Sequence, residues 1–241
     1  NTGSIKIGEM LSNDTLYDYL TKFGIGSKTG SGLPGESRGI LPKVADWSGT
    51  TAPTVAFGQG YSLTAMQATS VFATIANDGV RVSPTVIAGT SDSSGNYTPS
   101  ATRESVRVIS ADTAGKMRLM MESVVSANGT APSAAIPGYR VAGKTGTAQR
   151  IDDTCGCYRG YTASFIGFAP ADNPAYVISV TIQDPKGLHW GGYLGGPVFK
   201  KVMSFVLQSK GIAPTGTKII PIALTEKQLI AAKEASSVKT N

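Results

Sequence analysis

Three hydrophobic segments follow one another in the second half of the chain without a helical pattern between them. They occupy residues 141–149, 161–169 and 175–183, and the second and third are rich in β-branched and aromatic residues. Residues 170–174, with two prolines, form the short connection between the last two segments. Successive strands joined in this way are antiparallel, because a parallel crossover normally needs a connecting helix. The sequence therefore predicts an antiparallel sheet of at least three strands.

Helical patterns lie on the N-terminal side of these strands. Residues 5–23 predict two short amphipathic helices, the second capped by Asn13 or Asp14. A capping-box pattern at Thr64 opens a core helix, and Ser110 caps a third. Because strands and helices do not alternate regularly, we assign the fold class α+β, with an antiparallel sheet flanked by helices.

Glycine and proline suggest the structure of the remaining segments. Residues 80–88 are predicted to form a strand, and residues 90–102, rich in Ser, Gly and Asn, an exposed loop. Residues 191–196 are predicted to form a flexible turn, after which Pro197 begins a helix. The residues of that helix expected to face the sheet are Val198, Val202, Phe205 and Val206.

Composition limits the classes of protein to consider. With 241 residues, 41% of them hydrophobic, the chain is long enough to bury one sizeable core. Its net charge is +6, but the basic residues are scattered singly, so we expect no nucleic-acid partner. The chain begins at Asn1, and we expect it to be part of a longer protein. Residues 1–209 are assigned to one domain and residues 210–241, which carry little apolar pattern, to a C-terminal tail.

The chain has too few cysteine and histidine residues to form a typical zinc site. The two cysteines, Cys155 and Cys157, and the single histidine, His189, do not supply the four ligands of a structural zinc site, so no metal or other cofactor is predicted. A bend at Gly156 would bring the two cysteines within the Cα separation of roughly 6.8 Å that a disulfide allows. A small disulfide and two free thiols are both compatible with this pattern. His189, beside a tryptophan and glycines, is expected to have a loop or packing role.

The segment around Lys144 has two incompatible interpretations. Residues 138–145 match the phosphate-loop pattern GxxxxGK[ST], but such a loop must follow a buried strand and open a helix, and neither flank fits. The favoured interpretation is a strand at the edge of a cleft. A cation, the hydroxyls of Thr145 and Thr147 and a free backbone amide suit a carboxylate and the oxyanion of acyl transfer. Strand alternation places Lys144 and Gly146 on one face and the two threonines on the other, unless the strand twists.

Six short segments together carry a resemblance to a known family. In order they are FGIG at 23–26, LPGE at 33–36, AFGQG at 56–60, IANDG at 75–79, GKTGTA at 143–148 and SFIGF at 164–168. The ordered set resembles the transpeptidase domain of class B penicillin-binding proteins, over residues 1–209. It is most similar to the septal enzymes of cell division, in particular actinobacterial ones. The implied fold is that of penicillin-binding proteins and serine β-lactamases, a five-stranded antiparallel sheet to which this chain contributes at least three strands.

The resemblance also implies an activity and site residues. The family's members are peptidoglycan D,D-transpeptidases that cross-link stem peptides through a serine ester, and β-lactams acylate the same serine. Lys144, Thr145, Gly146 and Thr147 match the KTG motif, and Asn1 matches the asparagine of SxN. The implied roles are electrostatic and proton-relay for Lys144, carboxylate binding for the two threonine hydroxyls, oxyanion binding for the Thr147 amide, and substrate-amide binding for Asn1. Near the N-terminus, where the family's SxxK motif would be expected, Ser4–Ile5–Lys6 and Ser27–Lys28 do not have its spacing, so the nucleophile is expected elsewhere in the parent protein.

Partners and location follow from the same resemblance. The implied partners are peptidoglycan stem peptides, β-lactam antibiotics and membrane proteins of cell division. The implied location is the extracytoplasmic face of the cell membrane, with an N-terminal transmembrane anchor outside this chain. Two alternatives share the site: a β-lactam sensor domain, which acylates once and signals, and a carboxypeptidase, which hydrolyses the acyl-enzyme.

Overall fold

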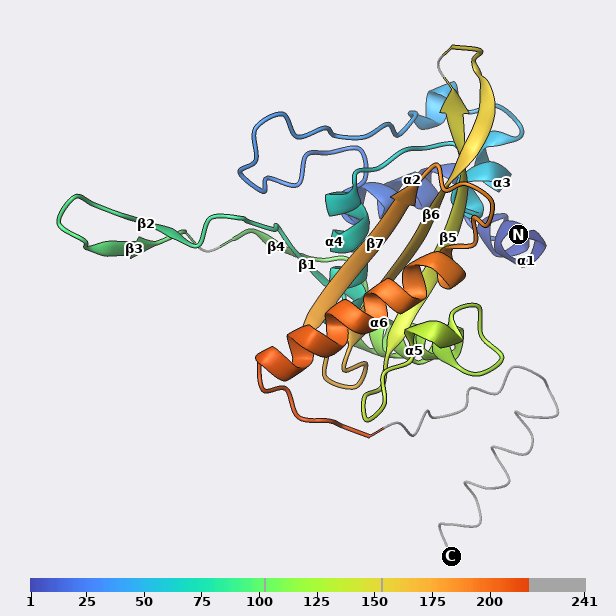
Figure 1. Cartoon of the computed structure of the whole chain (residues 1–241). Coiled ribbons are helices and arrows are strands. Elements are labelled where there is room, and N and C mark those ends of the chain that lie inside the picture. Colours follow the sequence, from blue (N-terminus) through green and yellow to red (C-terminus); the bar gives the residue numbers. More distant parts are fainter. Residues whose placement is uncertain (102, 153, 217–241) are drawn as a thin grey trace, which may run out of the picture.

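The computed structural model describes residues 1–101, 103–152 and 154–216, which form helices on both sides of a central sheet (Figure 1). The helices are α1 (Thr2–Gly8), α2 (Asn13–Lys22), α3 (Thr51–Ala56), α4 (Ala65–Ala76), α5 (Ala111–Glu122) and α6 (Gly191–Ser209). The strands are β1 (Val80–Val82), β2 (Gly89–Ser91), β3 (Tyr97–Pro99), β4 (Ser105–Arg107), β5 (Ala142–Asp152), β6 (Cys157–Ala169) and β7 (Tyr176–Gln183). Short 3-10 turns occupy Val44–Asp46, Ser123–Val125 and Pro132–Ala134. The predicted α+β class is confirmed.

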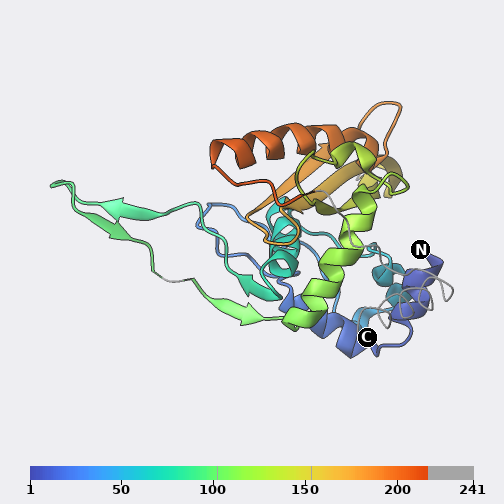
Figure 2. The ribbon, with the colours of Figure 1, turned by 90° about the horizontal axis from the view of Figure 1, so that it is seen from below.

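The central sheet has the strand order β5-β6-β7, and both of its pairings are antiparallel, as predicted. Helix α6 covers one face, and helices α4 and α5 lie on the other (Figures 1 and 2). On the α6 side, the buried Phe165 of β6 packs with Phe199, Met203 and Leu207. Three residues farther along β6, the buried Phe168 belongs to a second cluster on the α4 and α5 side. The sheet therefore separates two cores.

Helix α6 begins earlier than predicted and buries a different face. It starts at Gly191 rather than Pro197, and Pro197 lies inside it. The residues predicted to face the sheet include Val198, Val202 and Phe205, which are 45%, 43% and 70% exposed, so this prediction was wrong. The reason is a close contact that local sequence does not reveal. A Cβ added at Gly191 would lie 2.1 Å from the carbonyl oxygen of Ser164 in β6, so only glycine allows the first turn to approach the sheet this closely.

The segment of residues 80–102 also differs from its prediction. The predicted strand ends at Val82, two residues before Pro84, which has no N–H to continue a ladder. The predicted loop contains a hairpin instead, in which β2 pairs with β3. Its turn is built by Asp92, whose carboxylate accepts hydrogen bonds from the backbone N–H groups of Ser94 and Asn96, both at 2.9 Å. Figures 1 and 2 show this hairpin as an arm that projects from the body.

Helix caps account for most of the correctly predicted helix starts. Thr64 and Gln67 form the full capping box at α4, and the Ser110 hydroxyl accepts a hydrogen bond from the Thr113 N–H at 3.1 Å. At α2 the predicted cap was one or two residues late. The cap is Ser12, whose hydroxyl accepts from the N–H of Thr15 at 3.1 Å.

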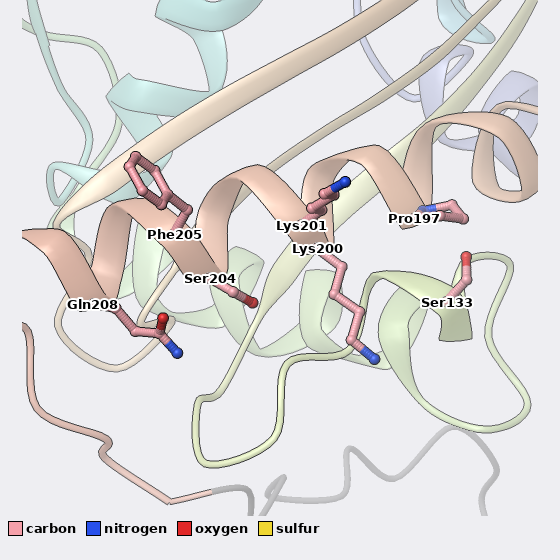
Figure 3. A pocket seen from close by; sticks show the side chains of 7 residues that line it. All are labelled: Ser133, Pro197, Lys200, Lys201, Ser204, Phe205 and Gln208. Carbon is pink, nitrogen blue, oxygen red and sulfur yellow. The ribbon is translucent and has the colours of Figure 1, made fainter.

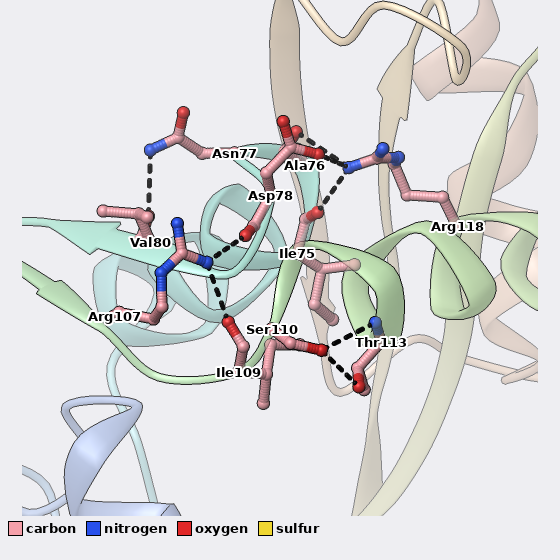
Figure 4. A network of polar contacts seen from close by, with 10 residues as sticks. All are labelled: Ile75, Ala76, Asn77, Asp78, Val80, Arg107, Ile109, Ser110, Thr113 and Arg118. Atoms are coloured by element: carbon pink, nitrogen blue, oxygen red, sulfur yellow. Dashed lines mark hydrogen bonds and ion pairs between the residues drawn. The ribbon is translucent and has the colours of Figure 1, made fainter.

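A polar network joins the end of α4 to α5 and β4 (Figure 4). Asp78 has a φ of 49° in the turn that follows α4. The Arg118 guanidinium of α5 donates to the Asp78 carboxylate at 2.7 Å and to the Ile75 carbonyl at 3.2 Å. Arg107 of β4 donates to the Asp78 and Ile109 carbonyls at 2.9 and 3.1 Å. These contacts fix the helices that lie under the sheet.

The β5–β6 hairpin ends in a disulfide between Cys155 and Cys157, whose Cα atoms are 5.2 Å apart. Of the two alternatives that the sequence left open, the structure therefore has the disulfide. None of the helices in the described residues is long and apolar enough to cross a membrane.

The residues after α6 return to the body. The Tyr139 hydroxyl donates to the Ile212 carbonyl at 2.7 Å, and the Gly216 N–H donates to the Gly138 carbonyl at 3.0 Å. Most of the predicted tail, residues 217–241, lies outside the described residues. The boundary at residue 209 stays a prediction.

A buried ion pair fixes the start of β5. Glu122, at the end of α5, is 1% exposed and accepts two hydrogen bonds from Arg140, at 2.9 and 2.6 Å. This carboxylate raises the pKa of Arg140 above its ordinary value. The Arg140 carbonyl in turn accepts from the N–H of Ala171 at 2.8 Å. The pair thereby ties α5, β5 and the β6–β7 connection together.

We expect Arg140→Ala to lower the free energy of unfolding by about 3–5 kcal/mol, because it leaves the Glu122 carboxylate buried without a partner. Urea denaturation followed by circular dichroism measures the change. The double variant Glu122→Leu/Arg140→Met, which removes both charges, should lose clearly less than the single variant. Equal losses in the two variants would contradict this account of the ion pair.

Candidate active site

A cleft of about 570 Å³ runs along β5, and all five site residues named from the sequence line it. They are Asn1, Lys144, Thr145, Gly146 and Thr147. The structure thus brings the first residue of the chain next to a strand more than 140 positions later. Sequence reasoning did not assign the other lining residues to the site: Phe57, Gly58, Gln59, Thr130, Ala148, Trp190, Gly191 and Gly192.

β5 is an edge strand of the central sheet, and this explains why consecutive residues of the strand all reach the cleft. β5 pairs only with β6 in the described part of the chain, so its other edge is open. The sequence predicted that Lys144 and Gly146 would face away from Thr145 and Thr147. Because the cleft follows the open edge itself, residues from both faces of the strand line it.

Lys144 supplies an uncompensated positive charge. Its ammonium donates to the carbonyl of Thr145 at 2.7 Å, and it takes part in no ion pair among the described residues. The side chain is exposed to the cleft, but the surrounding protein atoms partly desolvate its ammonium and lower its pKa below the ordinary lysine value, because desolvation disfavours the charged form. A cation in this state is suited to binding an anionic ligand.

The two threonine hydroxyls are held by different parts of the fold. The Thr145 hydroxyl lies 3.1 Å from that of Thr130, in the segment that precedes β5. The Thr147 hydroxyl accepts a long hydrogen bond, 3.4 Å, from the N–H of Gly191, the first residue of α6. The N-terminus of a helix carries a partial positive charge. Lys144 and this helix end together make the cleft favourable for a carboxylate.

Glycines allow the walls of the cleft to approach one another. A Cβ at Gly146 would lie 2.4 Å from the Ser164 hydroxyl, and one at Gly192 would lie 2.0 Å from the Thr130 carbonyl oxygen. A larger residue at Gly192 would push α6 away from the segment that precedes β5, and one at Gly146 would force the Ser164 hydroxyl to move.

The opposite wall comes from the N-terminal part of the chain. The turn after α3 contributes Phe57, Gly58 and Gln59, and α1, which packs against α3, contributes Asn1. Asn1 is the N-cap residue of α1, but its side chain makes no capping hydrogen bond. Nothing in the local sequence of this turn shows that it faces β5.

Aromatic rings border the cleft beside α6. His189 stacks on Tyr161 with ring centroids 4.0 Å apart, and Trp190 lies 5.0 Å from His189. Trp190 lines the cleft and is 60% exposed. His189 therefore has the packing role that was predicted for it.

A second hollow lies on the outer side of α6 and shares no lining residue with the cleft (Figure 3). Its residues are Ser133, Pro197, Lys200, Lys201, Ser204, Phe205 and Gln208. It contains none of the motif residues, and we do not assign the activity to it.

The phosphate-loop interpretation of residues 138–145 fails in the structure. Lys144 and Thr145 lie inside a strand that continues to Asp152, so they do not stand at the start of a helix. Consecutive N–H groups therefore do not converge on one point, as a phosphate site requires.

Comparison with known proteins explains this cleft. A model of the penicillin-binding protein transpeptidase domain matches residues 1–204. The chain belongs to the penicillin-binding protein transpeptidase family. The matching region contains all five site residues and every element of the central sheet. The resemblance to class B penicillin-binding proteins is therefore confirmed.

Individual relatives agree with this assignment. The chain is 40% identical over 222 residues to penicillin-binding protein PbpB of Mycobacterium tuberculosis, covering 88% of this chain and 33% of the relative. It is 34% identical over 215 residues to the peptidoglycan D,D-transpeptidase FtsI of Escherichia coli, covering 89% and 35%. A crystal structure of penicillin-binding protein 3 from M. tuberculosis, complexed with aztreonam, matches with a TM-score of 0.83 and 38% identity, covering 91% and 51%. The chain thus spans about a third of the length of these curated relatives and about half of the solved one.

We expect Gly191→Ala to lower the free energy of unfolding by about 1–3 kcal/mol, because the added methyl group forces α6 away from β6. Differential scanning calorimetry of the parent protein measures the loss. Gly115→Ala, in the middle of α5, is the matched control, since the nearest atom to its added Cβ is the end of Arg118 at 3.9 Å. The control should be neutral or more stable by up to about 1 kcal/mol. A neutral Gly191→Ala variant would contradict the close packing described here.

Proposed function

We propose that this chain is part of a septal peptidoglycan D,D-transpeptidase that cross-links stem peptides by serine acyl transfer and is acylated by β-lactams. The observation that carries the proposal is the convergence of Lys144, Thr145, Thr147 and Asn1 on one cleft at the N-terminus of α6. Support comes from the FtsI relative, which is itself named a peptidoglycan D,D-transpeptidase, and from the solved relative, which holds a β-lactam.

The cleft suits the chemistry of both ligands, because a stem peptide ending in D-alanine and a penicillin each carry a carboxylate next to the bond that breaks. The hydroxyls of Thr145 and Thr147 and the end of α6 bind this carboxylate. Lys144 adds electrostatic attraction and takes part in proton relay. Asn1 binds the amide of the substrate. The backbone N–H of Thr147 donates to the oxyanion, and a donor of this kind contributes on the order of 10²–10³ in rate.

The remaining parts of the proposal concern the parent protein. The nucleophilic serine and its general-base lysine belong to the part of the parent outside this chain. The reaction takes place on the extracytoplasmic face of the membrane, to which the parent is held by an N-terminal transmembrane helix outside this chain. Its partners are stem peptides, β-lactams and membrane proteins of cell division, and nucleic acid is not among them.

The proposed reaction is tested with purified parent protein, a donor peptide ending in D-alanyl-D-alanine and an acceptor amine. Mass spectrometry should detect a new amide between donor and acceptor, together with released D-alanine. Hydrolysis without amide formation would assign the site to a carboxypeptidase. A stable acyl-enzyme without turnover would assign it to a β-lactam sensor.

We expect Lys144→Ala and Thr145→Ala, each made in the parent protein, to slow penicillin acylation by about 10²–10³-fold, as loss of a preorganised polar contact does elsewhere. Stopped-flow measurement with a fluorescent penicillin gives the second-order rate constant. Lys200→Ala is the control, since Lys200 is an exposed lysine on the outer side of α6, and it should leave the rate unchanged. Unchanged acylation in the Lys144 and Thr145 variants would refute their assignment to the site.

We also expect a characteristic loss of acylation at high pH. The Lys144 ammonium is charged below its pKa, so its attraction for the ligand carboxylate is present at neutral pH and is lost as pH rises through that value. Because partial desolvation in the cleft lowers this pKa, the loss should occur below the ordinary lysine value of about 10.4. Rate constants measured across pH should show this alkaline limb in the wild type. The Lys144→Arg variant, whose guanidinium stays charged, should lack the limb; an identical limb in both proteins would contradict the assignment.

A further inference from the structure

The tip of the β5–β6 hairpin extends beyond the three-stranded sheet. β6 pairs with β7 only from Thr162, which lies opposite Gln183, whereas β5 and β6 pair with each other as far as Asp152 and Cys157. Figure 1 shows the two strands continuing past the end of β7. An isolated two-stranded hairpin is marginally stable at best in water. Order at the tip therefore depends on contacts made within the tip.

Side-chain packing contributes little to the order of the hairpin tip. Ile151 and Tyr158, which lie opposite each other across the hairpin, are 66% and 58% exposed. Cys155 and Cys157 are both exposed as well. The disulfide is thus accessible to a reagent in solution, and no apolar core of the described residues covers it.

Hydrogen bonds to Asp152 hold the turn independently of the sulfur atoms. The Asp152 carboxylate accepts from the N–H of Thr154 at 2.9 Å, and its carbonyl accepts from the N–H of Gly156 at 2.9 Å. Arg159, on the opposite strand, pairs with the same carboxylate at 3.3 Å. After the disulfide is opened, these contacts still favour a turn that keeps Cys155 and Cys157 near each other.

The disulfide contributes little to the stability of the whole fold. Its two cysteines are separated by one residue, and in the chain-entropy model the stabilisation grows with the length of the loop that is closed. The chain has only two cysteines, so within this chain the opened pair has no other cysteine with which to form a wrong disulfide. Exposed disulfides of this kind are the ones that exchange readily with thiols.

We propose that Cys155 and Cys157 form a reversible thiol–disulfide exchange site. The thiolate of an external reductant, a small thiol or a dithiol protein, attacks one of the two sulfurs and forms a mixed disulfide, and the other sulfur leaves as a thiolate. A second reductant thiolate then displaces the first cysteine. In total the S–S bond takes up two electrons and two protons, and the reductant becomes a disulfide. An external disulfide reverses the reaction.

Opening this pair acts on the strand that borders the cleft. Thr147 and Ala148 line the cleft, and the pairing of β5 with β6 is irregular immediately afterwards, between Gln149 and Ile151. The part of β5 beyond this irregularity belongs to the hairpin tip. Reduction therefore loosens the part of β5 that follows the cleft residue Ala148 and leaves the three-stranded sheet intact.

Thiol trapping in the folded parent protein tests the exchange. The protein is equilibrated in buffers of increasing ratio of reduced to oxidised glutathione, alkylated and digested with trypsin. Both cysteines lie in the peptide of residues 151–159, between Arg150 and Arg159. We expect this peptide to change from the disulfide to the doubly alkylated form while near-UV circular dichroism stays that of the folded protein. A peptide that remains oxidised until the protein is denatured, or that opens only together with unfolding, would overturn the proposal.

Hydrogen exchange tests the effect on the hairpin without relying on the proposed activity. On reduction, amides of residues 149–160 should exchange faster, while those of residues 162–169 should not change. The double variant Cys155→Ser/Cys157→Ser should fold and should reproduce the reduced pattern. A double variant that does not fold would make the disulfide a structural requirement and would sink the proposal. Unchanged exchange at the tip would disprove the link to the cleft.

Discussion

The close approach of α6 to the backbone of β5 and β6 is the constraint on which the rest of the site depends. Glycines at the start of the helix let its first turn lie almost directly on the strands, where a Cβ at Gly191 would meet carbonyl oxygens at 2.1 and 2.3 Å. This contact sets the rotation of the helix, and so Phe199, Met203 and Leu207 become its buried face. It also places the positive end of the helix beside the hydroxyl of Thr147. The close approach of α6 to the strands thus decides both which face of the helix is buried and where its positive end lies in the cleft.

Two cationic side chains near β5 have different electrostatic surroundings. Arg140, just before the strand, is paired with a buried carboxylate, and its two hydrogen bonds stabilise the junction of α5 with the sheet. Lys144, four residues later, has no acidic partner among the described residues and is exposed. A structural cation is compensated within the protein, whereas a cation meant for a ligand stays uncompensated until the ligand arrives. Under the proposed function, that ligand is the carboxylate of a stem peptide or of a β-lactam.

β5 joins parts of the molecule with different stability. Its first half is held between β6 and α5, and its second half belongs to a hairpin without a third strand. The cleft residues of β5, residues 144–148, lie in the first half and reach the point where the second half begins. Such a strand keeps Lys144 and Thr145 in fixed positions, while the nearby end of the cleft responds to conditions at the hairpin tip.

The sequence by itself determined the features whose causes are local or recur in a fixed order. Capping residues at Thr64 and Ser110 marked helix starts, segments rich in β-branched and aromatic residues marked β6 and β7, and the order of six short motifs was enough to identify the family. Only the tertiary structure decided the start and buried face of α6, because a run of glycines looks like a flexible turn until a sheet packs against it. The same holds for Gln59 and Trp190, because only the tertiary structure brings the turn after α3 and the start of α6 to the same cleft as β5. It also holds for Cys155 and Cys157, since local spacing allowed both states and the turn built by Asp152 brings their Cα atoms to 5.2 Å.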